Sequence, residues 1–332
     1  MMSRLVVDRA RARVPALLQD RSVSLIALII VTSIIMSLIS PYFLKLDNLL
    51  SMTQFGAVIG LLALGQTLVI LSGGGAIDIS VGSMLSLSGV AMGLLVGAGV
   101  PVWIAAAGTL IIGLTLGAFN GLIITVVGIP ALIATLGTLF LFGSFAQVLA
   151  GGPQLGGFDQ DGFAFLGTGT LLGIPAQVCL VLLPVYAVAS WVMRRTLFGR
   201  RVYEVGNNDK ALLLVGGSPR RIRFLLYCVS GLLAGLGGVV TNSWLLVARP
   251  GAGEGFDLQS ITIAVLAGTY IFGGKGRVSD TLLAVLLIVV LNSGLQLAGV
   301  DPAWQAGVLG LVLILSVVMN NLHMRRNGER RQ

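Results

Sequence analysis

The sequence predicts an all-α, polytopic membrane protein, a bundle of about ten transmembrane helices with broken or re-entrant segments. Of its 332 residues, 56% are hydrophobic and only 10% are charged, whereas soluble domains carry roughly 25% charged residues. Apolar runs recur along the chain at the length of roughly 20 residues that a helix needs to cross a bilayer. Lys and Arg are confined to a few loops and the two tails. These features exclude an ordinary soluble domain.

The remaining composition excludes several kinds of site. The net charge is +8, but its confinement to loops is explained by orientation in a membrane, so we expect no nucleic-acid partner. Cys179 and Cys228 lie in or beside apolar segments and are interpreted as small apolar side chains. The single histidine, His323, lies in the basic tail, so no histidine-based metal or catalytic site can be assembled. We therefore predict no metal, no cofactor and no enzymatic activity in this chain.

Ten spans follow one another within a single transmembrane domain, residues 1–332. They are predicted at 23–44, 49–72, 79–97, 102–127, 131–150, 170–193, 224–248, 258–272, 281–298 and 304–321. The eighth is short for a crossing, so we expect it to be tilted or partly re-entrant. Residues 73–78, Gly-Gly-Gly-Ala-Ile-Asp, form a break too polar and glycine-rich for the interior of a lipid-facing helix.

The basic residues fix the orientation of these spans. With the N-terminus inside, all of the 21 Lys and Arg residues except Lys45 and Arg249 fall on the cytoplasmic side. The cytoplasmic segments are then a basic head (1–22), a central loop (194–223), a small loop at Gly273–Arg277 and a basic tail (322–332). Both termini are predicted to be cytoplasmic. Residues 151–168 carry two acids and no base, and so lie outside.

The central loop holds eight basic residues and is too long for a loop that only sets topology. The alternative, a basic loop with no further role, needs only a few Lys or Arg residues. We expect a short helix from Asn208 to Val215, ended by Gly216-Gly217, which docks on a cytoplasmic partner. The residues assigned to this contact are Asn208, Asp209, Lys210, Ala211, Leu212, Leu213, Leu214, Gly216 and Gly217.

Polar residues within the spans are almost all uncharged, which suits a pathway for a neutral solute. The candidates for its lining are Gln66, Thr67, Asn120, Thr135, Thr138, Asn292 and Gln296. Gln66 and Thr67 rank first because they precede the glycine break. The alternative is that some of these residues only hold helices together. Ion-coupled transport has little support, since the one acid near apolar depth, Asp78, is expected to cap the third span.

Two glycine patterns concern packing and nucleotide binding. Gly113/Gly117 and Gly231/Gly235 have the four-residue spacing that lets helices approach closely, and packing within one subunit is favoured over a dimer seam. Gly273-Gly274-Lys275-Gly276 lacks the spacing of a phosphate-binding loop, and Gly276 stands where Ser or Thr should follow the lysine. If ATP drives this protein, another subunit binds it.

Five segments in the same order resemble those of ribose-type sugar permeases of ABC importers. Residues 76–83, Ala-Ile-Asp-Ile-Ser-Val-Gly-Ser, are similar to GIDLSVGS in that family, and residues 196–208 to T-x-FGR-x-x-Y-A-x-G-x-N. Residues 227–235 resemble Y-x-x-SG-x-x-AG, residues 273–278 GG-x-G-x-V, and residues 292–295 N-x-G-L. The matches extend over nearly the whole chain after the first span. Within them Asp78, Ser80, Gly82, Gly199 and Arg200 are taken as structural motif residues.

The chain also departs from this family pattern. Ala76 replaces a glycine, Glu204 replaces an alanine, and Leu212 and Leu214 make the segment after Asn208 more apolar. These changes suggest an unusual docking surface or a non-identical partner permease.

The resemblance implies a type II ABC importer. Two permease subunits would form the pathway at their interface, two cytoplasmic ATPase subunits with ATP and Mg would bind the central loops, and an extracytoplasmic sugar-binding protein would deliver a monosaccharide. Three alternatives remain: a branched-chain amino-acid permease, an ion-coupled symporter or channel, and a non-transporting scaffold.

Overall fold

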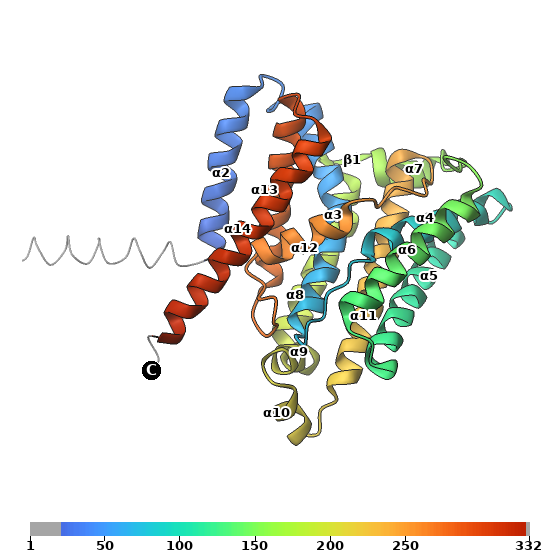
Figure 1. The fold of residues 1–332 in the computed structure, drawn as a ribbon. Coiled ribbons are helices and arrows are strands. Elements are labelled where there is room, and N and C mark those ends of the chain that lie inside the picture. Colours follow the sequence, from blue (N-terminus) through green and yellow to red (C-terminus); the bar gives the residue numbers. More distant parts are fainter. Residues whose placement is uncertain (1–20, 330–332) are drawn as a thin grey trace, which may run out of the picture.

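A computed structural model describes residues 21–329, most of them in helices (Figure 1). Residues 1–20 of the predicted basic head and residues 330–332 of the predicted tail lie outside the described residues. Within the described part, strand is limited to one short antiparallel pair, β1 (Thr170–Leu171) and β2 (Ile174–Pro175), and an isolated bridge joins Leu155 to Ala248. The predicted helical fold class is confirmed.

Among the residues that the structure describes, seven helices are long and apolar enough to cross a membrane. They are α2 (Arg21–Ile39), α3 (Leu46–Leu71), α5 (Val102–Leu122) with the π-helical η1 (Ile123–Val127), α6 (Ala131–Ala150), η2 (Val178–Leu182) with α8 (Leu183–Arg195), α11 (Pro219–Leu245) and α13 (Val278–Leu297). Three further helices carry shorter apolar stretches: α4 (Val81–Gly97), α12 (Phe256–Leu266) and α14 (Pro302–Glu329). The remaining helices are α7 (Asp161–Thr168), α9 (Leu197–Asn207) and α10 (Asp209–Leu214).

Several predicted boundaries were wrong. The first span ends at Ile39, because residues 40–45 form a turn. The sixth does not begin at Thr170, since Leu172 and Gly173 adopt positive φ and reverse the chain between β1 and β2. The eighth is the 11-residue helix α12, only about 16 Å long at 1.5 Å per residue. The central loop is itself helical, forming α9, α10 and the first turn of α11.

Helices α3 and α11 form the centre of the bundle, with α2 and α8 at its periphery. In the most apolar window of α3 89% of the residues are buried, against 17% for the helix that contains α8. Close packing joins α5 to α11, where the backbone of Gly113 and Gly117 lies against that of Gly231 and Gly235. The prediction that these glycines pack helices within one subunit is confirmed.

The two short helices α4 and α12 each follow a long helix through an irregular segment, and their N-terminal ends meet inside the molecule. A Cβ on Gly82 or Gly253 would collide with the other residue's carbonyl oxygen, so the two backbones are in direct contact. The N–H of Gly253 donates to Ser86 Oγ at 2.9 Å. Irregular backbone at membrane depth is tolerated only where it is buried in protein or lines a cavity. This junction meets that condition.

Candidate functional site

The segment between α8 and α11 forms a helical platform at one end of the bundle, opposite α7 (Figure 1). Its first helix, α9, begins at Thr196, whose hydroxyl accepts the N–H of Gly199 at 3.2 Å. Gly199, Val202 and Val205 share one buried face, as expected for residues three apart on a helix. Gly199 packs on the backbone of Met193, while Arg200 is exposed.

The second helix of the platform, α10, has both of its predicted end signals. Asn208 is its N-cap, and Asn208 Oδ1 accepts the N–H groups of Lys210 and Ala211 at 3.0 and 3.2 Å. At the other end Gly216 has φ +75°, and the N–H of Gly217 donates to the carbonyl of Leu212 at 2.9 Å. These bonds form a Schellman-type stop. The predicted short helix and its glycine end are confirmed.

One of the leucines assigned to the partner contact of α10 is buried instead. Leu212 is 2% exposed and packs against Gly217, so it belongs to the core of this subunit. Leu213, Leu214 and Val215 are 58%, 88% and 75% exposed. Large apolar side chains exposed together on the tip of a polar platform are typical of a protein-binding surface. We call Leu213, Leu214 and Val215 the α10 tip.

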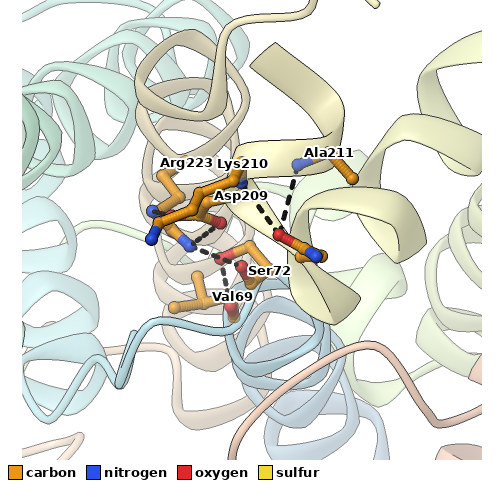
Figure 2. Close-up of polar contacts among 7 residues, drawn as sticks. Val69, Ser72, Asp209, Lys210, Ala211 and Arg223 are labelled. Atoms are coloured by element: carbon orange, nitrogen blue, oxygen red, sulfur yellow. Dashed lines mark hydrogen bonds and ion pairs between the residues drawn. The ribbon is translucent and has the colours of Figure 1, made fainter. Parts of the chain in front are cut away.

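Arg223 ties α10 to the transmembrane bundle (Figure 2). Its Nη1 and Nη2 atoms each donate to one carboxylate oxygen of Asp209 at 2.8 Å, and Nη2 also donates to the carbonyl of Ser72 at 3.1 Å. Ser72 directly follows α3, and its hydroxyl donates to the carbonyl of Val69 at 2.7 Å. One guanidinium thus joins three elements: α10, α11 and the end of α3. The sequence prediction missed this role of Arg223, because no local pattern pairs it with Asp209 14 residues earlier.

Two of the segments that carried the family resemblance, residues 196–208 and 273–278, meet the glycine break at this platform. Tyr203 donates its hydroxyl to the carbonyl of Gly276 at 3.0 Å, and the N–H of Gly274 donates to the carbonyl of Leu71 at 3.0 Å. A Cβ on Gly273 would collide with Gly73 and lie 3.1 Å from the Cα of Gly206. The central segment, the glycine break and the Gly273–Arg277 loop therefore form one packed unit.

Asp78 lies fully buried just before α4, where it connects three helices. Its Oδ1 accepts the backbone N–H of Ser80 at 3.0 Å and the Ser80 hydroxyl at 2.7 Å, while Oδ2 accepts the hydroxyl of Ser230 at 3.1 Å. Ser80 Oγ in turn accepts from the amide of Asn120 at 2.7 Å. The expected helix cap needs correction, because Ser80 is itself the N-cap residue of α4. Asp78 links α4 to α5 and α11 instead of capping the first helical turn.

Five of the seven pathway candidates lie in the packed interior of the subunit. Thr67 shares a 3.0 Å hydrogen bond with Thr281, while Thr135 and Thr138 donate to carbonyls within α6. Gln66 is fully buried, and neither side-chain polar atom has a hydrogen-bond partner among the described residues. Together with Asn120, these side chains do not line the large cavity described next. Their assignment to a pathway stays a prediction.

The other two candidates, Asn292 and Gln296, line a cavity of about 810 Å³ between α3, α12, α13 and α14. This volume falls in the range of small-molecule sites. Sequence analysis missed most of its polar lining, which comes from four helices and the end of α11: Asn48, Ser51, Trp244, Gln259, Thr262, Ser293 and Gln305. Among the described residues that line it, none is Asp, Glu, Lys or Arg. The cavity is mostly apolar, and the polar groups in its lining are uncharged.

Two acceptors in this lining have no partner in the described part of the chain. They are Gln259 Oε1 and Asn292 Oδ1. Their neighbours are fixed by the protein: Ser293 donates to Asn48 Oδ1 at 2.9 Å, and Gln305 donates to the carbonyl of Val300 at 2.8 Å. A buried amide oxygen without a partner costs free energy that a bound hydroxyl or amine can recover. Both side chains line the cavity, but the two oxygens themselves are buried in this conformation.

Comparison with known proteins assigns the family. Residues 48–317 match the family described as branched-chain amino acid transport system / permease component. The chain belongs to this permease family. The ribose import permease RbsC of Escherichia coli K12 is 38% identical over 301 residues, which cover 90% of this chain and 92% of the relative. The RbsC protein of Bacillus subtilis is 38% identical over 289 residues, covering 86% and 88%.

A further relative carries a different name. The autoinducer 2 import system permease LsrD of Klebsiella pneumoniae is 34% identical over 313 residues, covering 92% of this permease and 93% of the relative. No solved structure matches this permease. The described residues contain no cluster of His, Cys, Asp or Glu that could hold a metal ion.

Two long helices of the permease connect the cavity to the Arg223 contact. Met52 and Phe55, near the start of α3, line the cavity, while Ser72 at the end of that helix accepts from Arg223. Helix α11 carries Arg223 near its start and Trp244 near its end, at the cavity. Twenty residues of helix span about 30 Å. Helices α3 and α11 therefore both run from the Arg223 contact to the cavity.

Proposed function

We propose that this permease is the membrane subunit of an ATP-driven importer for a monosaccharide or a similar small, neutral, polar solute. The named relatives import ribose or autoinducer 2. The observation that carries the proposal for this chain is the uncharged cavity, whose lining includes the amide side chains of Asn48, Gln259, Asn292, Gln296 and Gln305. Sugar hydroxyls pair with such amides, and neutral partners hold a solute weakly enough to release it.

An amino acid is the less favoured substrate, although the family description names branched-chain amino acids. A zwitterion brings two charges into the membrane, and each needs an opposite charge or several dipoles to offset its lost hydration. The lining described here offers no charged side chain for either group. The same feature disfavours ion-coupled transport, which usually employs ionisable residues inside the membrane.

We expect partner proteins to bind at both ends of the permease. Cytoplasmic ATPase subunits, which would carry the ATP and Mg, bind the platform of α9 and α10 through the α10 tip. A second permease subunit, identical or related, completes the pathway, and an extracytoplasmic sugar-binding protein delivers the solute. In this arrangement both termini lie on the cytoplasmic side of a bacterial inner membrane, with the remaining surface of the spans in contact with lipid.

A charge placed in the cavity tests the proposal. The complete importer, assembled from this permease with its ATPase and binding-protein partners, is reconstituted and tested for ATP-dependent uptake of labelled ribose, other monosaccharides and leucine. Gln259→Glu puts a carboxylate among neutral groups and is expected to lower sugar uptake by about tenfold or more, because the charge stays poorly paired. Gln154→Glu, the same change at an exposed loop position, serves as the control and should leave uptake unchanged.

Three outcomes would contradict the proposal. Uptake of leucine in place of every sugar would assign the cavity to another substrate class. Uptake that persists without ATP and collapses with an ion gradient would indicate a secondary transporter. If the Gln259→Glu variant took up sugar at the rate of the unmodified protein, the cavity would not be part of the transport pathway.

A further inference from the structure

Arg21, at the start of α2, binds the short helix α12 from outside. Its Nε and Nη2 atoms donate to the backbone carbonyl of Leu266, the last residue of α12, at 3.1 and 2.7 Å. The two residues are 245 positions apart in the chain, and Figure 1 shows the start of α2 beside α12. Helix α2 is peripheral and packs mainly on α13. Through this one side chain it also reaches a helix of the packed interior.

The contact completes the C-terminal end of α12. The last four carbonyls of a helix have no partner within the helix. In α12 the carbonyls of residues 263–265 accept N–H groups from residues 267–269 at 2.8–3.1 Å. The carbonyl of Leu266 accepts the guanidinium N–H groups of Arg21 instead. A cation at this end also interacts favourably with the helix dipole, so Arg21 stabilises the helix end through its hydrogen bonds and through its charge.

The chain that follows α12 leaves room for the arginine. Gly268 has φ +86°, and a Cβ on it would lie 3.2 Å from Arg21 Nε and 3.3 Å from Arg21 Cγ. The glycine thus allows both the left-handed turn and the close approach of the side chain. A guanidinium can direct two N–H groups at one acceptor in a fixed plane, whereas lysine offers one ammonium on a flexible stem. The position is therefore suited to arginine.

The next residue of α2 binds the start of α13. Ser22 Oγ donates to Asp280 Oδ1 at 2.7 Å, and Asp280 is 3% exposed. Helix α12 ends at Leu266 and α13 begins at Val278. The first two residues of α2 therefore contact both ends of the connecting segment, residues 267–277. Together the two contacts fix the end of α12 relative to α13.

Helix α12 forms part of the wall of the cavity of about 810 Å³. Gln259 and Thr262 line this cavity, and Leu266 lies about one helical turn beyond Thr262. The helix has only 11 residues, and glycines with positive φ, Gly255 and Gly268, lie on either side of it. Because neither flanking segment continues the helix, its position depends on contacts with its neighbours. Arg21 supplies such a contact at the C-terminal end.

We propose that Arg21 is a positioning residue for the solute cavity, because it holds α12 where Gln259 and Thr262 form the cavity wall. This inference rests on the proposed function, in which the cavity holds the transported solute. Arg21 does not itself line the cavity, so its effect passes through α12. Without the bond to Leu266 the C-terminal end of α12 is free to shift, and the solute loses hydrogen-bond partners that the wall had aligned.

The first test measures the contact without any transport assay. Hydrogen exchange of backbone amides is followed by mass spectrometry on the full-length permease in nanodiscs. Arg21→Gln should speed exchange in peptides that cover α12 by about tenfold, because the loss of a charge-assisted bond lets the helix end open more often. Arg21→Lys keeps the charge and should show a smaller increase. Arg221→Gln, the same change at an exposed position, is the control and should leave exchange in α12 unchanged.

The second test separates positioning from general support of the fold. In the reconstituted importer, Arg21→Gln should lower the amount of sugar taken up per ATP hydrolysed by about tenfold, because a displaced cavity wall leaves solute hydroxyls unpaired. Arg21→Lys should recover part of this ratio. If Arg21→Gln does not insert into the membrane, Arg21→Lys is compared with the unmodified protein in both assays.

Three results would overturn the proposal. The first is unchanged exchange in α12 when Arg21 is replaced, and the second is an equal increase in the Arg221→Gln control. The third is a proportional loss of uptake and ATP hydrolysis, which would indicate partial unfolding. If the unmodified importer takes up no sugar, the proposed function fails instead, while exchange in α12 still decides the Arg21 contact.

Discussion

Arg223 binds both carboxylate oxygens of Asp209 at 2.8 Å while donating to the backbone carbonyl of Ser72 at 3.1 Å. The contact places one side chain between the helix proposed to receive the ATPase and the helix α3 that reaches the cavity. Asp209 is 42% exposed and Arg223 16%, so the ion pair alone stabilises the contact only modestly. Through its hydrogen bond to Ser72, Arg223 also holds the end of α3, which Asp209 does not contact.

The first prediction orders the effects of changing this contact. Arg223→Gln removes the guanidinium donors to Asp209 and Ser72 and is expected to weaken the contact between α10 and α3 by about 1–3 kcal/mol. In the reconstituted importer, we expect substrate-stimulated ATP hydrolysis to fall roughly tenfold. Asp209→Asn should lose less, because the bond to Ser72 remains. Arg221→Gln, a change at an exposed neighbour, is the control. An Arg223→Gln variant that matches Arg221→Gln would exclude the coupling role.

The second prediction concerns the α10 tip. Leu214 is 88% exposed, so Leu214→Asp should leave folding and insertion intact while weakening ATPase binding by at least about 2 kcal/mol, as for a central interface residue. Binding of the purified ATPase is measured by co-purification and by titration. Ala211→Asp, at an exposed position on the same helix, is expected to abolish coupling for the same reason.

Two further variants separate docking from folding. Leu212→Asp should lower the stability of the permease itself, because Leu212 is buried within the subunit. Leu172→Asp changes a fully exposed leucine in the β1–β2 turn and should have no effect on ATPase binding. Normal binding by Leu214→Asp would move the docking surface away from the α10 tip.

The third prediction concerns the junction of the two short helices. Gly82→Ala places a methyl group on the carbonyl of Gly253, and overpacking of this kind costs about 1–3 kcal/mol or more where backbone must move. The expected result is a lower unfolding temperature in detergent. Gly137→Ala in α6 has open space for its methyl group and should be neutral or stabilising by about 0.5–1 kcal/mol. Equal unfolding temperatures for the two variants would contradict the backbone contact.

The fourth prediction compares pathway candidates by cysteine labelling, after Cys179 and Cys228 have been replaced. Gln296 is exposed to the cavity, whereas Gln66 and Thr67 are buried. Gln296→Cys should therefore react with a small polar thiol reagent without nucleotide. Gln66→Cys and Thr67→Cys should react only if the assembled complex opens α3, so their reactivity is expected to change when ATP is added. If both stay inert in every nucleotide state, α3 does not line the route beyond the cavity.

Local signals in the sequence were sufficient to predict several parts of the structure. Asn208 and Gly216 define the ends of α10 because cap and stop depend on neighbouring backbone groups. The spacing of Gly113 and Gly117 predicts a close helix contact because residues four apart share a face. Low charge and long apolar runs predict the membrane bundle, since hydrocarbon excludes unpaired polar backbone.

The sequence by itself determined the class of fold, the position of the platform in the chain and the neutrality of the pathway candidates. Only the tertiary structure decided which of them share a cavity, why Leu212 turns inward, and that Arg223 bonds to Ser72, 151 residues away along the chain. The physical reason is range: caps, turns and periodicity act within a few residues, whereas a cavity and an ion pair depend on how distant helices pack. In the sequence, Asn292 and Gln296 resemble the other polar candidates. Only the packing of α3, α12 and α14 around them places these two side chains in a cavity.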